Sequence, residues 1–433
     1  MEHNRHPKVA VIGLGFIGLP LALTYAMKGA MVVGVDVLEK HIEEINLGKS
    51  HHLEYYQGKS LVDILNEQLQ AKRFEGTTSY QEAASKVDTY IITVGIPVVN
   101  GDPNQTYLQS ACEDLAKVLR AGDTVILRST VIPGTTEEFV THLLEKSGLK
   151  AGVDFHLAYA SERIAEGKAF EEFIHMPLAV GGINQESAEK AKSILSFVTE
   201  AEITISEIKV VETAKVIENI QRDVNIAMVQ QFARFSEKLG IDTFELIKVA
   251  NTHKRVNLLT PGPGVGGYCL PNALYYLLPK AKELNVNIEL LEMARKINDS
   301  VPQVLVDMVE AELQKSGKSL LNTKVAVLGL AMKDFSNDDR ISPPHHVVEI
   351  LLERGATVKA YDPAVPSTYS YKVDHLDEAI DGADVLIYLT AQEEFLEISW
   401  DLLIKQMAAE PILLDTKHRI PKGASDIARL LRI

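Results

Sequence analysis

The sequence predicts an α/β fold in which two doubly wound, Rossmann-like domains are joined by a long central helix. Three observations support this prediction. Short apolar runs alternate with amphipathic segments near the N-terminus, residues 207–239 contain neither glycine nor proline, and the alternation then restarts. A chain of 433 residues is also too long for one ordinary core, so several domains are expected.

The expected domains are residues 1–206, 207–310 and 311–433. Strands of the first domain are predicted at Lys8–Gly13, Ala30–Asp36, Thr89–Val94 and Thr124–Arg128. The central helix is expected over Glu207–Leu239, with Gly240 ending it and Asp242 capping the helix that follows. Strands of the last domain are predicted at Lys324–Gly329, Thr357–Tyr361, Asp384–Thr390 and Pro411–Asp415.

Composition narrows the function to a soluble enzyme that acts on a small molecule. The formal net charge of -15 argues against general affinity for nucleic acid or anionic membranes. No apolar stretch approaches the roughly 18 residues of a membrane helix and the first seven residues are polar, so we expect a cytoplasmic protein. The apolar circumference of residues 207–239 exceeds what one monomer face needs, which predicts a homodimer or a higher homo-oligomer.

The sequence Gly13-Leu14-Gly15-Phe16-Ile17-Gly18 follows a predicted strand and opens a predicted helix. In this pattern the first glycine permits a tight turn, the second lets the backbone approach a pyrophosphate, and the third allows close helix packing. Asp36 ends the next strand, where its carboxylate suits a ribose 2'-hydroxyl and would repel a 2'-phosphate. The pattern therefore predicts NAD as the cofactor rather than NADP.

The restarted domain has Gly329-Leu330-Ala331 after its first strand and no third glycine. A second NAD is therefore not expected there. Another nucleotide or a purely structural role remains open, and a cleft between the two domains would hold the substrate.

Two cysteines, Cys112 and Cys269, lie too far apart in the sequence to suggest a disulfide framework. Cys269 directly follows the glycine-rich run from Pro261 to Tyr268, where little side-chain bulk hinders a ligand, so it is a candidate nucleophile. Cys112 lies in a helix-like segment and is expected to be a small buried apolar residue.

Polar residues of the central helix recur at spacings of three, four and three, at Glu212, Lys215, Asn219 and Arg222. They share one helical face, which either lines a cleft or is an ordinary solvated face; the apolar remainder of the helix favours the cleft. Glu162 and Glu166 could share one side of a helical turn and manage protons, although a surface ion-pair network would also explain them. The 13 histidines show no metal-ligand spacing, so no metal is expected.

With these segments in order, the chain resembles the UDP-glucose and GDP-mannose dehydrogenase family nearly from end to end. The motifs that carry the resemblance are Gly13 to Pro20, Ser129-Thr130-Val131 with Pro133-Gly134, Glu162 to Glu166, Lys215 with Asn219, Gly264 to Cys269, Gly329 to Lys333, and Asp338 to Pro343. The segments His253 to Asn257 and Pro261 to Gly267 are similar to the branch that acts on UDP-N-acetylmannosamine or UDP-N-acetylglucosamine. UDP-glucose is the second choice.

The resemblance also implies roles for individual residues. Cofactor contacts are implied for Gly13, Gly15, Phe16, Ile17, Gly18, Asp36 and Thr130. Substrate contacts are implied for Arg163, Lys215, Asn219, Arg222, Arg255, Gly266, Lys333 and Arg340. Catalytic roles are implied for Cys269, Lys215, Asn219, Glu162, Glu166 and Thr130.

The implied reaction oxidises the sugar's 6-hydroxyl to an aldehyde, captures it on Cys269, oxidises the adduct to a thioester and hydrolyses this to the uronic acid, using two NAD per sugar. Lys215 and Asn219 would stabilise the oxyanion, while Glu162, Glu166 and a water held by Thr130 would handle protons. Such a product belongs to polysaccharide biosynthesis.

The chain departs from the family pattern next to the cysteine. Ala273 stands where the family usually has aspartate, Asn272 where lysine or valine is frequent, and Tyr268 where the hexosamine branch often has histidine. Gln230-Gln231 replaces the usual Asn-Glu. Three outcomes therefore stay open at the level of sequence: a complete four-electron dehydrogenase, an oxidation that stops at the aldehyde or takes an unusual sugar, and a nucleotide-sugar-binding protein without turnover.

Overall fold

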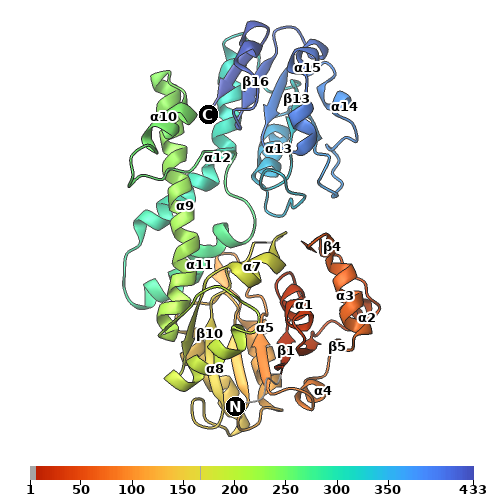
Figure 1. Cartoon of the computed structure of the whole chain (residues 1–433). Helices are drawn as coiled ribbons and strands as arrows, with labels where there is room; N and C mark the ends of the chain where they lie inside the picture. The colour runs from red at the N-terminus through yellow and green to blue at the C-terminus, as the bar shows by residue number, and fades with distance from the viewer. Residues whose placement is uncertain (1–5, 166) are drawn as a thin grey trace. The chain divides into compact units, whose positions relative to one another are not determined.

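The computed structural model describes residues 6–165 and 167–433, and Figure 1 shows the course of the chain. It divides into two compact units, the first made of residues up to 218 together with 275–286, the second of residues 219–274 and 287–433. The helices over residues 208–239 and 269–283 are each divided between the two units. The units therefore do not test the boundaries of the three predicted domains, which stay a prediction.

The first unit is built on one sheet. Its strands among the described residues are β1 (Lys8–Ile12), β2 (Met31–Val35), β5 (Phe74–Thr77), β6 (Thr89–Ile92), β9 (Thr124–Leu127), β10 (His156–Ala160), β11 (Leu178–Gly182) and β12 (Ile203–Ser206). They lie in the order β12-β11-β10-β9-β6-β1-β2-β5. The last six positions, from β10 to β5, are parallel and have the strand order of a dinucleotide-binding Rossmann sheet, while β11 pairs with β10 in antiparallel orientation.

Helices connect these strands and cover the sheet. They are α1 (Gly18–Met27), α2 (Glu39–Asn46), α3 (Leu61–Gln70), α4 (Tyr80–Ala84), α5 (Thr106–Ala116), α6 (Thr141–Leu144), α7 (Ala169–His175) and α8 (Gln185–Leu195), with a π-helical turn at Thr136–Val140 before α6. Two short hairpins pair β3 (Tyr55–Tyr56) with β4 (Lys59–Ser60), and β7 (Val98–Val99) with β8 (Asp102–Pro103). One large core packs the apolar faces of α1, α3, α7 and α8 against the sheet.

The predicted central helix is confirmed as α9 (Ile208–Leu239). It ends at Gly240, whose φ of 75° lies in the left-handed region that favours glycine. The Asp242 carboxylate then accepts hydrogen bonds from the first amides of α10 (Thr243–Ala250), as the sequence predicts. The remaining long helices are α11 (Cys269–Glu283) and α12 (Glu289–Gln314).

The second unit contains a five-stranded parallel sheet among its described residues. The strands are β13 (Lys324–Leu328), β14 (Thr357–Tyr361), β15 (Val385–Tyr388), β16 (Ile412–Asp415) and β17 (Arg429–Arg432), in the order β14-β13-β15-β16-β17. Apolar side chains of α12 and α13 (Pro343–Glu353) pack on one face, and those of α14 (Leu376–Ile380) and α15 (Trp400–Gln406) pack in a separate core. This is a second doubly wound sheet, which confirms the predicted fold class.

Five strands of the two sheets were not predicted: β5, β10, β11, β12 and β17. β11 carries two glycines, which are poor strand formers, yet both are required where helices come close. A Cβ at Gly181 would lie 2.6 Å from the backbone of Ile208 at the start of α9, and one at Gly182 would lie 2.2 Å from the amide of Ala188 on α8.

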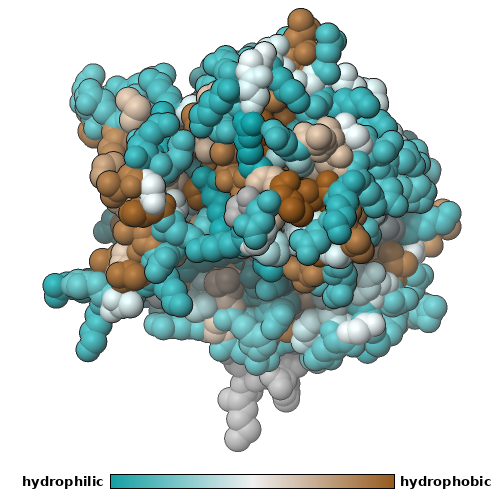
Figure 2. Space-filling view, turned by 90° about the horizontal axis from the view of Figure 1, so that it is seen from above, coloured by the Kyte–Doolittle hydropathy of each residue, from teal (hydrophilic) through white to brown (hydrophobic). Residues whose placement is uncertain are grey.

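The surface is mixed in character. Figure 2 shows a largely hydrophilic face with separate hydrophobic groups. Within the described residues, no helix has the length and apolar character that crossing a membrane requires.

Candidate active site

The glycine-rich turn between β1 and α1 has the geometry that its sequence predicts. Gly13 has a φ of 91°, and a Cβ there would lie 3.2 Å from the amide of Val94. A Cβ at Gly18 would fall 1.7 Å from the carbonyl oxygen of Gly13, whereas Gly15 has open space on its Cβ side. The turn therefore needs its first and third glycines for packing, and the second leaves room for a ligand.

Asp36 follows β2 and faces this turn. Its Oδ2 accepts a hydrogen bond from the amide of Leu14 at 2.8 Å, and its Oδ1 accepts one from the amide of Leu38 at 3.0 Å. Beside it opens a cavity of about 520 Å³, lined by Gly13, Gly15 and Asp36 together with Thr93 and Tyr107. The open side of Gly15 and the adjacent carboxylate fit a dinucleotide. The individual contacts of Gly13, Gly15, Phe16, Ile17, Gly18 and Asp36 with NAD remain predictions.

The corresponding turn in the second sheet is occupied by a side chain of the protein itself. Asp362 follows β14, and its Oδ2 accepts hydrogen bonds from the amides of Leu330 at 2.7 Å and Ala331 at 3.1 Å. A Cβ at Gly329 would lie 2.2 Å from the carbonyl oxygen of Thr390. Asp36 accepts from the amide of Leu14 in the first turn in the same way, so this carboxylate is a feature that the two turns share.

Thr130 lies just after β9 and a few residues before a turn that is held by a buried carboxylate. The side chain of Glu212 on α9 accepts hydrogen bonds from the amides of Gly134 at 2.6 Å and Thr136 at 2.9 Å. Burial raises the pKa of Glu212, and these hydrogen bonds act in the opposite direction. The sequence placed Glu212 on a polar face that favours a cleft; instead, its carboxylate is fully buried and holds the amides of Gly134 and Thr136.

The other members of that face differ in exposure. Lys215 is buried, Asn219 is half-buried and Arg222 is exposed. Lys215 belongs to the first unit, and Asn219 and Arg222 belong to the second. Their predicted roles toward the substrate stay predictions.

The segment between β10 and α7 carries Glu162 and is called the acidic loop here (residues 161–168). Residues 161–165 are not helical, so the prediction that Glu162 and Glu166 share a helical turn is wrong for the part that can be described, and Glu166 lies outside the described residues. Glu162 is buried, pairs with Arg128 at 2.8 Å and accepts a hydrogen bond from the amide of Ile164 at 2.7 Å. Its carboxylate is therefore fixed in place by a cation and a backbone donor.

Arg163 of the acidic loop is also engaged within the protein. Its guanidinium donates to both carboxylate oxygens of Glu218 on α9, one of them at 3.0 Å, and to the carbonyl oxygen of Pro177 at 2.9 Å. This pairing supports a role in holding the loop against α9, and substrate binding by Arg163 stays a prediction.

Cys269 is exposed and is the first residue of α11. The unpaired amides at a helix N-terminus favour a nearby negative charge such as a thiolate. By contrast, Cys112 is buried in α5, and burial raises the pKa of its thiol to about 12, in agreement with the prediction that it is inert.

The glycine-rich loop before Cys269 packs tightly on the segment after β13. A Cβ at Gly266 would lie 2.6 Å from the Cδ of Pro343 and 2.8 Å from the carbonyl oxygen of Ile341. A Cβ at Gly267 would lie 2.6 Å from the Sδ of Met332. The resemblance placed both the cysteine loop and the segment from 332 to 343 at the substrate, and the structure brings them into contact within the second unit.

Of the cationic residues predicted to bind the substrate in this unit, Lys333 and Arg255 are exposed. Arg340 is also exposed and pairs with Asp338, with its Nη2 2.7 Å from a carboxylate oxygen. Next to it, Asp339 accepts hydrogen bonds from Tyr369 at 2.7 Å and Ser367 at 3.2 Å. This aromatic and acidic cluster was not predicted, because its members are 28 and 30 residues apart in the sequence.

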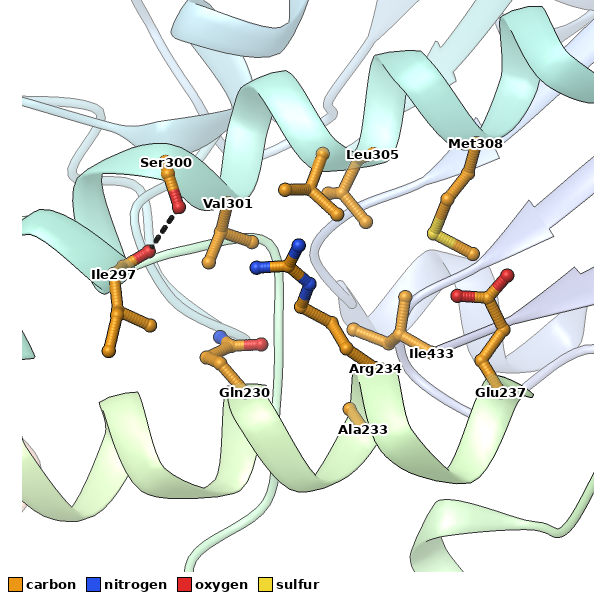
Figure 3. Close-up of a pocket in the computed structure, with 11 residues that line it drawn as sticks. Gln230, Ala233, Arg234, Glu237, Ile297, Ser300, Val301, Leu305, Met308 and Ile433 are labelled. Carbon is orange, nitrogen blue, oxygen red and sulfur yellow. Dashed lines mark hydrogen bonds between the residues drawn. The ribbon is translucent and has the colours of Figure 1, made fainter. Parts of the chain in front are cut away.

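The departure at Gln230 has a structural role. Its side-chain amide donates to the carbonyl oxygen of Gly262 at 2.9 Å, which anchors the start of the cysteine loop to α9. Figure 3 shows Gln230 beside Ala233 and Arg234 on α9, opposite Val301 and Leu305 of α12. The small cavity between them, of about 20 Å³, is largely apolar apart from its rim.

Among the residues that the structure describes, no group of three or more His, Cys, Asp or Glu side chains could hold a metal ion.

Three family models match the chain in sequence order. They are the NAD binding domain of the UDP-glucose/GDP-mannose dehydrogenase family at residues 7–198, its central domain at residues 209–300 and its UDP binding domain at residues 326–422. The UDP-N-acetyl-D-mannosamine dehydrogenase of Pyrococcus horikoshii is 35% identical over 413 residues, which cover 95% of this chain and 96% of that protein.

Solved structures agree with the sequence comparison. The structure of the UDP-D-ManNAc dehydrogenase from Pyrococcus horikoshii has a TM-score of 0.89 at 35% identity and covers 98% of this chain and 99% of its own. An NDP-N-acetyl-D-galactosaminuronic acid dehydrogenase from Methanosarcina mazei has a TM-score of 0.87 at 28% identity, with 99% and 95% covered. The chain therefore belongs to the UDP-glucose/GDP-mannose dehydrogenase family and is an NAD-dependent nucleotide-sugar dehydrogenase.

Proposed function

We propose that the protein oxidises C6 of UDP-N-acetylmannosamine to the uronic acid through a thioester on Cys269. One observation carries the chemistry: an exposed cysteine at the start of α11, at the end of a glycine-rich loop that packs on residues 332–343. The choice of sugar rests on the full-length similarity to UDP-N-acetyl-D-mannosamine dehydrogenases.

The reaction would take place in four steps at C6 of the sugar: an oxidation, an addition, a second oxidation and a hydrolysis. NAD, held by the glycine-rich turn and Asp36, would supply the hydride acceptor for both oxidations. The first oxidation turns the 6-hydroxyl into an aldehyde and releases a proton. The Cys269 sulfur then adds to the carbonyl carbon, and the carbonyl oxygen takes a proton to give a thiohemiacetal. The second oxidation converts this adduct into a thioester, and water finally cleaves the carbon-sulfur bond to give the carboxylic acid and the free thiol.

Other residues would stabilise charge and handle protons. Lys215 would supply a cation and Asn219 an amide donor to the oxyanion that forms on the sugar's C6 oxygen. Thr130 would hold a water, with Glu162 and Glu166 receiving and returning protons. The ion pair with Arg128 keeps Glu162 oriented, which supports its role as a fixed acceptor.

The nucleotide would be held by the second unit. Arg340 and Lys333 are exposed cations on the segment after β13, Arg222 is an exposed cation on α9, and Arg255 is one in the turn after α10. Guanidinium and ammonium groups are the donors that bind diphosphates. Any contact of Gly266 with the sugar would come from its backbone, because Pro343 and Ile341 fill the space on its Cβ side.

The test is to count NADH per sugar consumed. Purified protein is given UDP-N-acetylmannosamine, UDP-N-acetylglucosamine, UDP-N-acetylgalactosamine or UDP-glucose, each with NAD or NADP. We expect two NADH per UDP-N-acetylmannosamine, the highest kcat/KM for that sugar, and a clear preference for NAD. One NADH per sugar would indicate that oxidation stops at the aldehyde, and none with any sugar would indicate a binding protein.

A further inference from the structure

Residues 50–54 cross the surface of the first unit between α2 and β3. This segment contacts two loops that are far from it and from each other in sequence, the glycine-rich turn at residues 13–18 and the acidic loop. Neither contact is signalled by local sequence pattern.

At one end, His52 lies against the glycine-rich turn. The residue is 5% exposed, and its ring packs edge-on against Phe16, with 5.2 Å between ring centroids. Ser50 fixes the ring, since its Oγ is 2.7 Å from Nδ1 of His52. His41 on α2 supports the same turn, because its Nε2 donates to the carbonyl oxygen of Leu14 at 3.1 Å.

The contact of His52 with the turn is one of packing rather than of charge. Burial lowers the pKa of His52 to about 4, the neighbouring His51 and His41 add to this effect, and the backbone of Gly15 opposes it. The ring is therefore neutral near pH 7. Its steric effect is to hold Phe16 and Gly15 at the place where a pyrophosphate would approach.

At the other end, Glu54 holds the acidic loop. This carboxylate is 2% exposed, and its two oxygens accept hydrogen bonds from the amides of Gly167 at 2.5 Å and Ala169 at 3.0 Å. Gly167 has a φ of 89°, so the chain turns sharply here before α7 begins. Charge-assisted bonds from a buried carboxylate are among the stronger hydrogen bonds in proteins.

We propose that residues 50–54 form a positioning brace, in which His52 holds the glycine-rich turn for the cofactor and Glu54 holds the acidic loop for the reaction. The role of His52 assumes that NAD binds at the glycine-rich turn, and this assumption rests on the match to the family's NAD binding domain. The role of Glu54 rests on the proposed function, because it assumes that the acidic loop handles protons at the thioester.

The first experiment measures NAD affinity by calorimetric titration without any sugar. His52→Leu keeps the apolar contact but removes the ring geometry, and Ser50→Ala removes only the hydroxyl that fixes the ring. We expect His52→Leu to weaken NAD binding about tenfold and Ser50→Ala about threefold, the range of one or two lost hydrogen bonds. His175→Gln, at the exposed end of α7, is the control and should bind NAD as the wild type does.

The second experiment addresses Glu54. In Glu54→Gln, amide hydrogen exchange at Gly167 and Ala169 should be about tenfold faster, while NAD affinity stays within about twofold of wild type. Uronic acid formation should slow by about tenfold, with little change in the KM for NAD. Glu67→Gln is the control, because Glu67 pairs with Lys59 at the surface.

The roles of His52 and Glu54 can be overturned independently of each other. Unchanged NAD affinity in folded His52→Leu and Ser50→Ala would overturn the role of His52, and unchanged exchange at Gly167 and Ala169 in Glu54→Gln would overturn the role of Glu54. If the wild type oxidises no UDP-sugar, the proposed function fails, and the titration and the exchange measurement still decide whether the brace exists.

Discussion

Cys269 and Cys112 have the same side chain in opposite surroundings, exposed at a helix N-terminus and buried inside a helix. This contrast makes Cys112 an internal control for Cys269. Chemistry at a thiol needs access and a stabilised thiolate, and only Cys269 has access.

We therefore predict that Cys269→Ser abolishes uronic acid formation and leaves NAD affinity nearly unchanged. A hydroxyl is a much weaker nucleophile than a thiolate, so neither the covalent adduct nor the thioester forms. Product analysis by mass spectrometry and NAD titration are the measurements. Cys112→Ala should retain activity and lose only stability, and acid production by Cys269→Ser at the wild-type rate would remove Cys269 from the mechanism.

Ala273 gives the second prediction at this scale. It lies one turn after Cys269 in α11, where the family usually has an aspartate, and it is 2% exposed. Without that carboxylate, thioester hydrolysis should be slower than hydride transfer. Mixing protein, NAD and sugar should give a burst of NADH followed by a slower steady phase, with a sugar adduct on Cys269 in the intact mass.

Ala273→Asp should speed the slow phase, up to about a hundredfold if the lost carboxylate was worth about 3 kcal/mol. Because position 273 is buried, the same change should also lower the melting temperature. Ala273→Asn is the matched control, similar in size but without charge, and it should not speed the slow phase. The absence of a burst and of an adduct would mean that hydrolysis is not limiting, and that another group has taken over this role.

Sequence alone predicted some of these residues and not others, for a physical reason. Cys269, Asp36 and the glycines are recognisable because each acts at a defined place in a local pattern. Glu54 and Glu212 bind backbone amides 113 and 78 residues away, so no local spacing reveals them. The helical face that includes Glu212 was recognised, but periodicity says which face a residue is on and not what lies opposite.

At the level of elements, different glycines of the glycine-rich turn serve packing and ligand binding: Gly18 is needed for packing, and Gly15 leaves space for a ligand. Gly15→Ala would place a methyl group in open space, so it should fold normally and weaken NAD binding. Gly18→Ala would place one 1.7 Å from the carbonyl oxygen of Gly13, so α1 must shift.

We expect Gly15→Ala to keep the wild-type melting temperature while losing roughly tenfold or more in NAD affinity. Gly18→Ala should lose both stability and NAD binding. Thermal unfolding with and without NAD gives both quantities in one series. If Gly15→Ala instead bound NAD as tightly as the wild type, the pyrophosphate would lie elsewhere.

Some strands were predicted from the sequence and others were missed. Most of the strands that were found are continuous runs rich in valine, isoleucine and leucine, and several of those found, such as β1 and β14, end at a glycine or an aspartate. β10 and β11 were missed because alanine and glycine make up much of both strands, and their place in the sheet is fixed by packing against α8 and α9. Tertiary contacts override weak propensity in such strands.

For the whole molecule, we predict at least a homodimer that uses α9. Several apolar side chains of this helix are exposed in the single chain, among them Val210 at 51%, Phe235 at 64% and Leu239 at 59%. Large apolar groups gathered on one helix are unusual for a monomer surface. Light scattering at micromolar concentration should give at least twice the 47.7 kDa of one chain.

Phe235→Glu should lower the measured mass toward that of one chain, because a charge would have to be buried in the interface. Lys238→Glu, at an exposed polar position on the same helix, is the comparison and should have a smaller effect. A monomeric mass for the wild type would contradict the prediction.

Asp362 in the second sheet has a consequence for redesign. The fold occurs twice in this chain, and in both copies a carboxylate accepts a hydrogen bond from the amide after the first glycine of the turn, Asp36 in the first copy and Asp362 in the second. Changing Asp362 alone would not create a second dinucleotide site, because the second copy has the buried Ala331 where the first has Gly15 with open space beside it. A dinucleotide could bind there only after several coordinated substitutions. Single mutations would therefore not exchange the roles of the two copies.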